Sequence, residues 1–286
     1  MICQRLERRL FICAALLVVA LVLAGPVGAQ PSPESEQILR ELRALAWQQG
    51  PTDGHVGGVA TVKVPEGLAF LDAANTRRFL ELNQNPPRDN HYTLAMPDLS
   101  WFAIFFFEDS GYVKDDEKLD PDALLKSLQA SDERANGERK RLNMPGLHTV
   151  GWHVPPHYDA ATKRLEWGLR LQGDDGKTVV NYTIRILGRR GVMHATLVSD
   201  PASLDKDMAA FKDTLGGYGF TPGERYAEFK SGDRVAEYGL AALVLGGGAA
   251  VAVKSGFAKA IWKFLVVGVV ALGGAITAVL RKLRRR

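Results

Sequence analysis

Cysteine is almost absent from this sequence. The 286 residues include two cysteines, Cys3 and Cys13, and both lie within the first 29 residues. That segment has the pattern of a secretory signal peptide, with three arginines, an apolar run over residues 10–23 and small residues at 27–29. Cleavage after Ala29 leaves no thiol, which excludes disulfides, thiolate metal sites and cysteine nucleophiles. An uncleaved signal anchor is the alternative, and it places the following chain in the same compartment.

Short catalytic motifs are also missing. The sequence has no Gly-x-Ser-x-Gly elbow, no phosphate-binding P-loop, no dinucleotide fingerprint and no internal repeat. We therefore assign no catalytic residue and expect no cofactor. The pattern favours a binding or scaffold module over an enzyme. The alternative is a hydrolase-like or metal-dependent periplasmic enzyme, because folding can bring distant histidines and carboxylates together.

The positive net charge of the chain comes from its ends. The formal charge is +4, but the part between the signal peptide and the apolar C-terminal region carries 25 basic and 31 acidic side chains, a net charge of −6. Nucleic-acid binding requires a basic face on the folded part, so we expect no nucleic-acid partner.

A membrane anchor is predicted at residues 239–280. Residues 261–280 are apolar except for Lys263 and Thr277, and twenty helical residues span about 30 Å, the thickness of the hydrocarbon core. The tail, residues 281–286, carries five positive charges and is therefore expected in the cytoplasm. A second apolar run, residues 240–256, contains three consecutive glycines. It either lies against the single span or forms a second span, which would place the tail outside.

Strand-like alternation dominates the middle of the chain. Two runs, residues 164–171 and 179–187, are joined by the turn Gly173-Asp174-Asp175-Gly176, and a third run covers residues 192–198. Residues 101–107 are the most apolar piece of the soluble part and predict a central strand that is buried on both faces. Helices are expected at residues 73–82, from Asp120-Pro121 onward, and from Asp200-Pro201 onward.

These elements predict a single soluble α+β domain with an antiparallel sheet flanked by helices, followed by the transmembrane helix. The domain is expected at residues 56–238, with an N-terminal helical arm at residues 30–55. Its oligomeric state does not follow from the sequence.

Two groups of residues are candidates for ligand binding. His148, His153 and His157 surround Trp152 and Pro155-Pro156-His157-Tyr158, and imidazoles at these spacings can ligate zinc or copper if the loop folds back. The alternative is a rigid Pro-Pro corner whose aromatic side chains pack on the sheet. The second group contains Arg185, Arg189 and Arg190, which are candidates for binding an acidic ligand or lipid headgroups. Its alternative is a solvated turn.

Several motifs occur in order from about residue 56 to the C-terminus. They are Pro65-Glu66-Gly67, Gly111-Tyr112-Val113-Lys114-Asp115-Asp116-Glu117, Gly151-Trp152, Pro155-Pro156-His157-Tyr158-Asp159, Leu187-Gly188-Arg189-Arg190-Gly191-Val192 and Pro222-Gly223-Glu224-Arg225-Tyr226-Ala227-Glu228-Phe229. With these motifs the chain resembles the DUF2167 family of predicted membrane-anchored bacterial proteins. The resemblance implies anchoring in a bacterial envelope and assigns no catalytic residue. The order of elements is also similar to that of PsbP-type α/β sandwiches, in layout only.

Together these features predict a protein of the bacterial inner membrane. The soluble domain is expected in the periplasm, and the expected partners are the lipid bilayer and an envelope protein.

Overall fold

The computed structural model describes residues 33–83, 85, 87–141 and 146–246. The chain divides into two compact units, residues 1–39 and 40–286, and helix α2 (Pro33–Ala44) contains the boundary between them. The architecture described below belongs to the second unit. The expected signal peptide, the 261–280 span and the 281–286 tail lie outside the described residues. Within the described part, no helix is long and apolar enough to cross a membrane.

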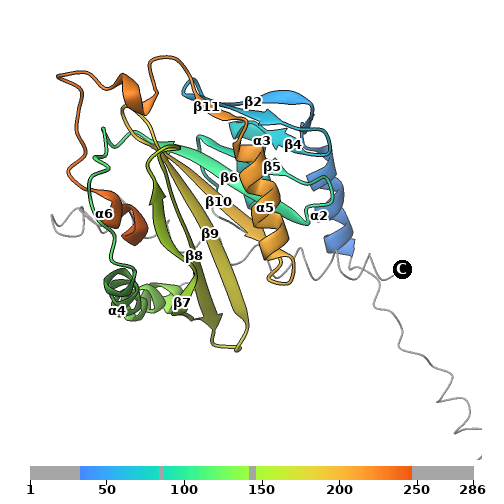
Figure 1. The fold of residues 1–286 in the computed structure, drawn as a ribbon. Coiled ribbons are helices and arrows are strands. Elements are labelled where there is room, and N and C mark those ends of the chain that lie inside the picture. The colour runs from blue at the N-terminus through green and yellow to red at the C-terminus, as the bar shows by residue number, and fades with distance from the viewer. Residues whose placement is uncertain (1–32, 84, 86, 142–145, 247–286) are drawn as a thin grey trace, which may run out of the picture. The chain divides into compact units, whose positions relative to one another are not determined.

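An eight-stranded antiparallel sheet organises the second unit (Figure 1), and its strands follow the order β1-β4-β5-β6-β10-β9-β8-β7. The predicted mixed class, an antiparallel sheet with helices, is confirmed, and so is the meander of β8, β9 and β10. The strands are β1 (Gln48–Gln49), β4 (Ala69–Leu71), β5 (His91–Ala95), β6 (Trp101–Glu108), β7 (Leu147–Asp159), β8 (Arg164–Gly173), β9 (Thr178–Leu187) and β10 (Val192–Ser199).

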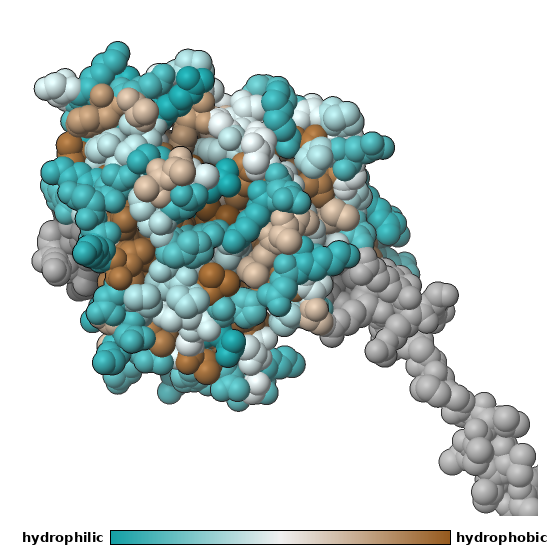
Figure 2. All heavy atoms as spheres, viewed as in Figure 1, coloured by the Kyte–Doolittle hydropathy of each residue, from teal (hydrophilic) through white to brown (hydrophobic). Residues whose placement is uncertain are grey.

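One face of this sheet packs against helix α5 (Leu204–Leu215) and a small second sheet, and we call it the α5 face. The second sheet has the order β11-β3-β2, with β2 at Thr52–Val56, β3 at Ala60–Val64 and β11 at Tyr218–Phe220. Phe105, Ala195 and Ile184 of the large sheet share a buried core with Val62 of β3 and Phe211 of α5. Figure 2, which has the view of Figure 1, shows hydrophobic residues on the surface only as separate patches between hydrophilic ones.

The opposite face, the α4 face, packs against α3 (Ala73–Leu82), α4 (Pro121–Arg141) and α6 (Leu240–Leu245). Alternation along the strands separates the two faces, because successive side chains of a strand point to opposite sides. A second buried core on this face contains Leu165 and Trp167 of β8, Val192 of β10, Leu124 of α4 and Leu243 of α6.

Local signals explain the helix boundaries. The Asp72 side chain accepts a hydrogen bond from the Asn75 backbone N–H at 2.9 Å, which caps α3. Asp120 does the same for Ala123 at 3.0 Å, and Pro121 is the first residue of α4, as predicted. The third predicted helix begins later than Asp200-Pro201, because residues 201–203 form a turn before α5.

Strand β6 lies in the interior of the sheet, between β5 and β10, as predicted. The predicted burial on both faces is observed for Trp101, Phe102 and Ala103. Phe105 is also buried, whereas Ile104 and the last three residues of β6 are only partly buried. The reason is that the α4 face is covered at its two sides, by α3 and by α4 with α6, and less so between them.

Two features of the structure differ from the prediction. The strands begin at Gln48, before the expected domain start at residue 56, because β1 pairs with β4 and β2 pairs with β3. The expected Pro-Pro corner is part of strand β7, which continues through Pro155 and Pro156 with several register shifts. Among the described strands, β7 is an edge strand that pairs with β8 alone, so prolines remove no bond to a second strand there.

The segment 221–239, here called the C-terminal strap, connects β11 to α6. It contains a short 3-10 helix, Tyr226–Glu228, and it leads to α6, where Leu240, Leu243 and Val244 are buried in the core of the α4 face. The first six residues of the apolar run 240–256 therefore belong to the folded core, and the rest of that run, from residue 247, lies outside the described residues.

Candidate functional site

The three candidate histidines lie along one strand but do not converge. All three belong to β7, and each imidazole contacts a carboxylate from a different element. Among the described residues, no group of three or more metal-ligating side chains is placed to hold a metal ion. The pairs are His148 Nε2 with Asp174 Oδ1 at 2.9 Å, His153 Nε2 with Asp205 Oδ1 at 2.9 Å, and His157 Nε2 with Glu166 Oε1 at 2.6 Å.

Glu166 is the most heavily bonded of these carboxylates. Besides His157, it accepts hydrogen bonds from Lys212 Nζ at 3.0 Å and from the Tyr182 hydroxyl. Burial opposes its ionisation, but the hydrogen bonds from Tyr182 and Lys212 lower the pKa of Glu166 below its ordinary value. Both carboxylate oxygens are thus occupied, so Glu166 joins β8 to β7, β9 and α5 as a fixed anion.

Arg189 and Arg190 hold the C-terminal strap. Arg189 bonds both oxygens of Asp233 at 2.7 and 2.8 Å, and Arg190 pairs with Glu224 at 2.7 Å and with Asp109 at 2.5 Å. The hydrogen bonds from Arg189 lower the pKa of Asp233 to about 2. These two arginines are therefore already paired with carboxylates of the protein.

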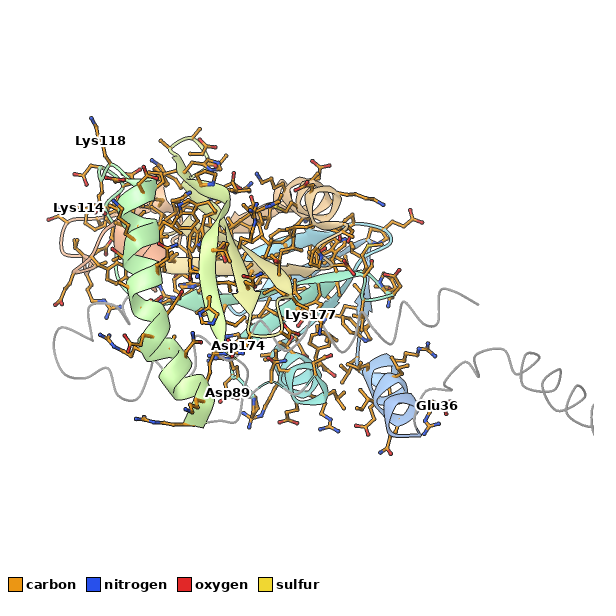
Figure 3. The ribbon with its side chains drawn as sticks, turned by 90° about the horizontal axis from the view of Figure 1, so that it is seen from below. Glu36, Asp89, Lys114, Lys118, Asp174 and Lys177 are labelled. Atoms are coloured by element: carbon orange, nitrogen blue, oxygen red, sulfur yellow. The ribbon has the colours of Figure 1, made fainter. Side chains whose placement is uncertain are left out.

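Backbone and side-chain contacts extend this attachment toward α6. The Tyr112 N–H donates to the Arg234 carbonyl at 2.8 Å, and the Ala236 N–H donates to the Tyr112 carbonyl at 2.9 Å. Farther along, Glu117 accepts from the Ala241 N–H at 3.0 Å at the start of α6. Figure 3 shows Lys114 and Lys118, from the same segment before α4, pointing outward from the protein.

Arg185 lies apart from the other two arginines, on the α4 face of β9. Its guanidinium lies over the Trp167 ring at 5.2 Å from the ring centre. Within the described residues its one hydrogen bond runs to the neighbouring Ile184 carbonyl at 3.4 Å, and its Nε is buried without a partner there. Burial lowers the pKa of Arg185 to about 10, so the side chain remains charged at neutral pH.

His194 is the cross-strand neighbour of Arg185 on β10 and is 3% exposed. Its Nε2 lies 2.8 Å from Glu108 Oε2, and a carboxylate only accepts hydrogen bonds, so this nitrogen carries the proton. Burial and the charge of Arg185 lower the pKa of His194 to about 4, which makes the imidazole neutral at physiological pH. Its Nδ1 is then an acceptor, and it is buried without a partner in the described part of the chain.

Next to Arg185 and His194, aromatic rings on the neighbouring strands β6 and β5 extend the same line of side chains across the sheet. The Phe106 ring stacks between two imidazoles, His194 at 4.1 Å and His91 at 4.7 Å between ring centres. We call Arg185, His194, Glu108 and Trp167 the arginine-histidine site. It is the candidate functional site because it combines a buried charge with two unsatisfied polar atoms, which folded proteins rarely leave unpaired.

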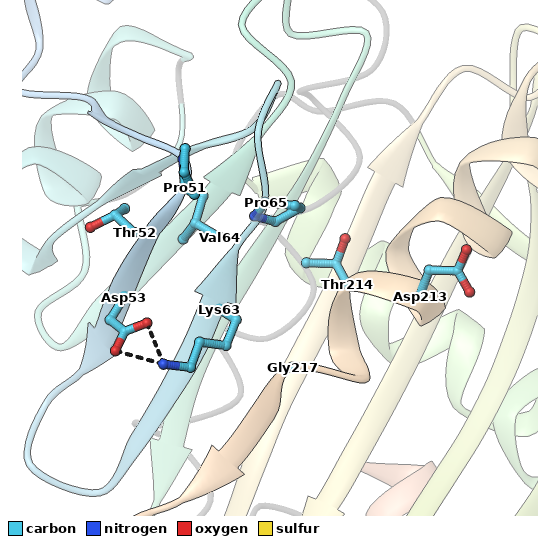
Figure 4. A pocket seen from close by; sticks show the side chains of 9 residues that line it. All are labelled: Pro51, Thr52, Asp53, Lys63, Val64, Pro65, Asp213, Thr214 and Gly217. Atoms are coloured by element: carbon cyan, nitrogen blue, oxygen red, sulfur yellow. Dashed lines mark hydrogen bonds and ion pairs between the residues drawn. The ribbon is translucent and has the colours of Figure 1, made fainter.

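A shallow hollow of about 610 Å³ lies elsewhere, on the side of the small sheet (Figure 4). Pro51, Val64, Pro65, Thr214 and Gly217 are among the residues around it. At its rim Lys63 and Asp53 pair at 2.8 Å, and both side chains are well exposed. The polar groups drawn there do not converge on one point, so the hollow offers no defined chemistry.

Sequence reasoning identified Arg185 but missed His194 and Glu108. One signal was present, because Val192, His194, Thr196 and Val198 alternate with the apolar Met193, Ala195 and Leu197. That pattern places His194 on the opposite side of the strand from the α5 face. It does not say that β10 lies beside β6, which is the pairing that brings Glu108 within reach.

Comparison with known proteins gives a family. The family described as "Protein of unknown function (DUF2167)" matches residues 48–277. The chain belongs to this family. The DUF2167 match begins at the first residue of β1 and covers every strand of both sheets.

A search of curated proteins finds no match for this chain. Among solved structures, the solution structure of cyanobacterial PsbP (CyanoP) from Synechocystis sp. PCC 6803 is similar, with a TM-score of 0.35 and 10% sequence identity. The similarity covers 69% of this chain and 100% of that one. A likeness this distant carries no information about what the DUF2167 chain binds.

Proposed function

We propose that this DUF2167 protein is a membrane-anchored binding or scaffold module of the bacterial envelope. In this proposal the signal peptide directs export, the folded part faces the periplasm, residues 261–280 cross the inner membrane and the basic tail stays in the cytoplasm. The lipid bilayer is one partner, and an envelope protein or a small ligand is the other.

The observation that carries the tethering role is the attachment of the C-terminal strap. Ion pairs from Arg189 and Arg190 hold the strap, and α6 continues it into the core of the α4 face. Only residues 246–260 separate this attachment from the expected span. A chain anchored in this way keeps the folded part close to the membrane surface, because a short linker limits its reach.

The binding role rests on the arginine-histidine site. Most charged side chains described above pair with an opposite charge of the protein, as Arg189, Arg190 and Glu166 do. Arg185 has no carboxylate within ion-pair distance among the described residues, and it keeps partial solvent exposure. A half-buried cation without a paired anion costs stability, and such a cost is retained where a function requires it.

Single-cysteine labelling tests the topology. The mature chain is expected to have no cysteine, so Ser231→Cys in the exposed part of the strap and Arg286→Cys at the end of the tail each introduce one thiol. With a membrane-impermeant maleimide applied to cells with a permeabilised outer membrane, we expect Ser231→Cys to react. Arg286→Cys should react only after the inner membrane is broken.

Other labelling patterns contradict this arrangement in different ways. Reaction of both variants before the inner membrane is broken would place the tail outside, as in the two-span alternative. Protection of Ser231→Cys in such cells would refute the periplasmic location of the folded part.

A further inference from the structure

Arg185 and His194 present two complementary unsatisfied atoms side by side. The residues are paired across β9 and β10, so both side chains lie on the α4 face. Among the residues that the structure describes, Arg185 Nε is a donor without an acceptor, and the neutral His194 Nδ1 is an acceptor without a donor. Both atoms are closed to bulk water, and no carboxylate of the described residues lies within ion-pair distance of the arginine charge.

The carboxylate whose charge acts on Arg185, that of Glu108, is already engaged. Glu108 accepts from His194 Nε2 at 2.8 Å and from the Tyr238 hydroxyl at 3.1 Å. Burial opposes its ionisation, but the hydrogen bond from His194 lowers the pKa of Glu108, so it stays charged. Its charge acts on Arg185 from a distance, without a direct ion pair. An anion placed against the guanidinium is therefore the missing partner.

The surroundings indicate the kind of anion. Trp167 lies under the guanidinium and the partly exposed Phe106 ring lies beyond His194, so the site has apolar walls on two sides. A carboxylate group matches the planar guanidinium, and an attached hydrocarbon group would contact the aromatic walls.

We propose that Arg185 and His194 bind a small organic carboxylate on the α4 face, with uptake of one proton by His194. One carboxylate oxygen accepts from Arg185, and the other accepts from the newly protonated Nδ1. The proton comes from solvent, and the Glu108 carboxylate balances the charge of the imidazolium. This inference names a ligand class for the binding role proposed above and rests on that role.

Binding is coupled to pH with a defined sign. In the free protein the pKa of His194 is about 4, because burial and Arg185 disfavour the imidazolium. A bound carboxylate offsets the Arg185 charge and raises this pKa, so binding strengthens as the pH falls, by up to about tenfold per pH unit. The other groups that face His194 are Glu108, with Tyr238 behind it, and His91 on β5.

The test uses the full chain in detergent and follows its thermal unfolding midpoint by tryptophan fluorescence. Sodium propionate is compared with sodium chloride at equal ionic strength, and with propionamide, the neutral analogue of the same shape. We expect propionate alone to raise the midpoint, with a larger rise at about pH 5.5 than at about pH 7.5. An equal effect of propionate and chloride, or a rise with propionamide and none with propionate, contradicts the proposal.

Two variants locate the effect. Arg185→Met keeps the length of the side chain and should abolish the propionate shift, while the ligand-free protein becomes as stable as the wild type or more stable. Arg170→Met removes an exposed arginine from the opposite face of the sheet and should leave the shift unchanged. A large loss of stability in ligand-free Arg185→Met would instead show a structural role for Arg185 and overturn the proposal.

His194→Gln gives an independent readout. Its amide can donate to a carboxylate but does not titrate, so propionate should still bind and the pH dependence should disappear. A pH dependence that survives in His194→Gln would refute proton uptake at this residue. None of these outcomes tests the proposed membrane topology, which cysteine labelling tests separately.

Discussion

At the scale of single residues, burial in the core of the α5 face determines which substitutions are costly. Phe105 is fully buried and meets Phe211 edge to face, with ring centres 6.1 Å apart. We expect Phe105→Ala to lower the free energy of unfolding by about 3–5 kcal/mol, because it removes packing and leaves a cavity. Urea unfolding measures this change. Val150→Ala is the control, since Val150 is 49% exposed, and a similar loss there would contradict the assignment.

The Arg189–Asp233 pair makes stability depend on pH at the acid end. The pKa of Asp233 is lowered to about 2 in the folded protein. The ionised carboxylate therefore stabilises the fold fully at a pH above the ordinary aspartate pKa, and this stabilisation is lost as the pH falls toward about 2. Asp233→Asn should therefore weaken this part of the acid transition, followed by circular dichroism. Asp53→Asn, which breaks the exposed pair with Lys63, is the matched control. An unchanged acid transition in Asp233→Asn would be the contrary result.

At the scale of elements, helix α4 protects the free edge of the sheet. Figure 3 shows α4 alongside the strands, and its side chains bond the backbone of β7 on the side where the structure describes no neighbouring strand. Asn136 bonds both the N–H and the carbonyl of Leu147 at 2.8 Å, and Asp132 accepts from the Thr149 N–H at 2.6 Å. Unpaired strand edges are sites of association between molecules, and α4 closes this one.

We therefore expect Asn136→Ala to destabilise the protein by about 1–3 kcal/mol, because two backbone groups lose their partner. Hydrogen exchange at the Leu147 amide should become faster, and gel filtration should show association at high concentration. Glu133→Ala alters an exposed residue of the same helix and should do neither. Unaltered exchange at Leu147 in Asn136→Ala would show that α4 does not protect this edge.

At the scale of the whole molecule, the attachment of the C-terminal strap connects the folded part to the expected membrane span. Gly111 lies where the strap crosses the segment after β6, with φ of 93°, and a Cβ there would lie 2.9 Å from the Arg234 carbonyl oxygen. Gly111→Ala should therefore loosen the strap, because the added methyl group meets backbone. Limited proteolysis of the full chain should then cut within residues 221–239.

Gly223→Ala is a close control for this prediction. Gly223 also has φ of 93°, so alanine causes the same backbone strain, but no atom of the described residues lies within 4 Å of the added Cβ. Only Gly111→Ala combines strain with a clash. Equal protease sensitivity of the two variants would show that the clash at the strap is unimportant.

The sequence by itself determined the elements whose signals are local. Alternation and the turn at residues 173–176 predicted the meander, and the helix at residues 73–82 was predicted with its observed bounds. The proline at Pro121 and the cap at Asp120 likewise marked the start of α4. Side-chain periodicity and capping act over a few residues, which is why a linear pattern reveals them.

Only the tertiary structure decided the candidate site. Glu108 and His194 are 86 residues apart, and they meet because β10 pairs with β6 in one register. The three histidines of β7 look like a cluster in the sequence, yet β7 directs them to carboxylates on different elements. Arg189 and Arg190 are likewise engaged by the strap, whereas Arg185 is not. Strand order and register depend on contacts between distant segments, so they assign each charge a partner that local sequence does not specify.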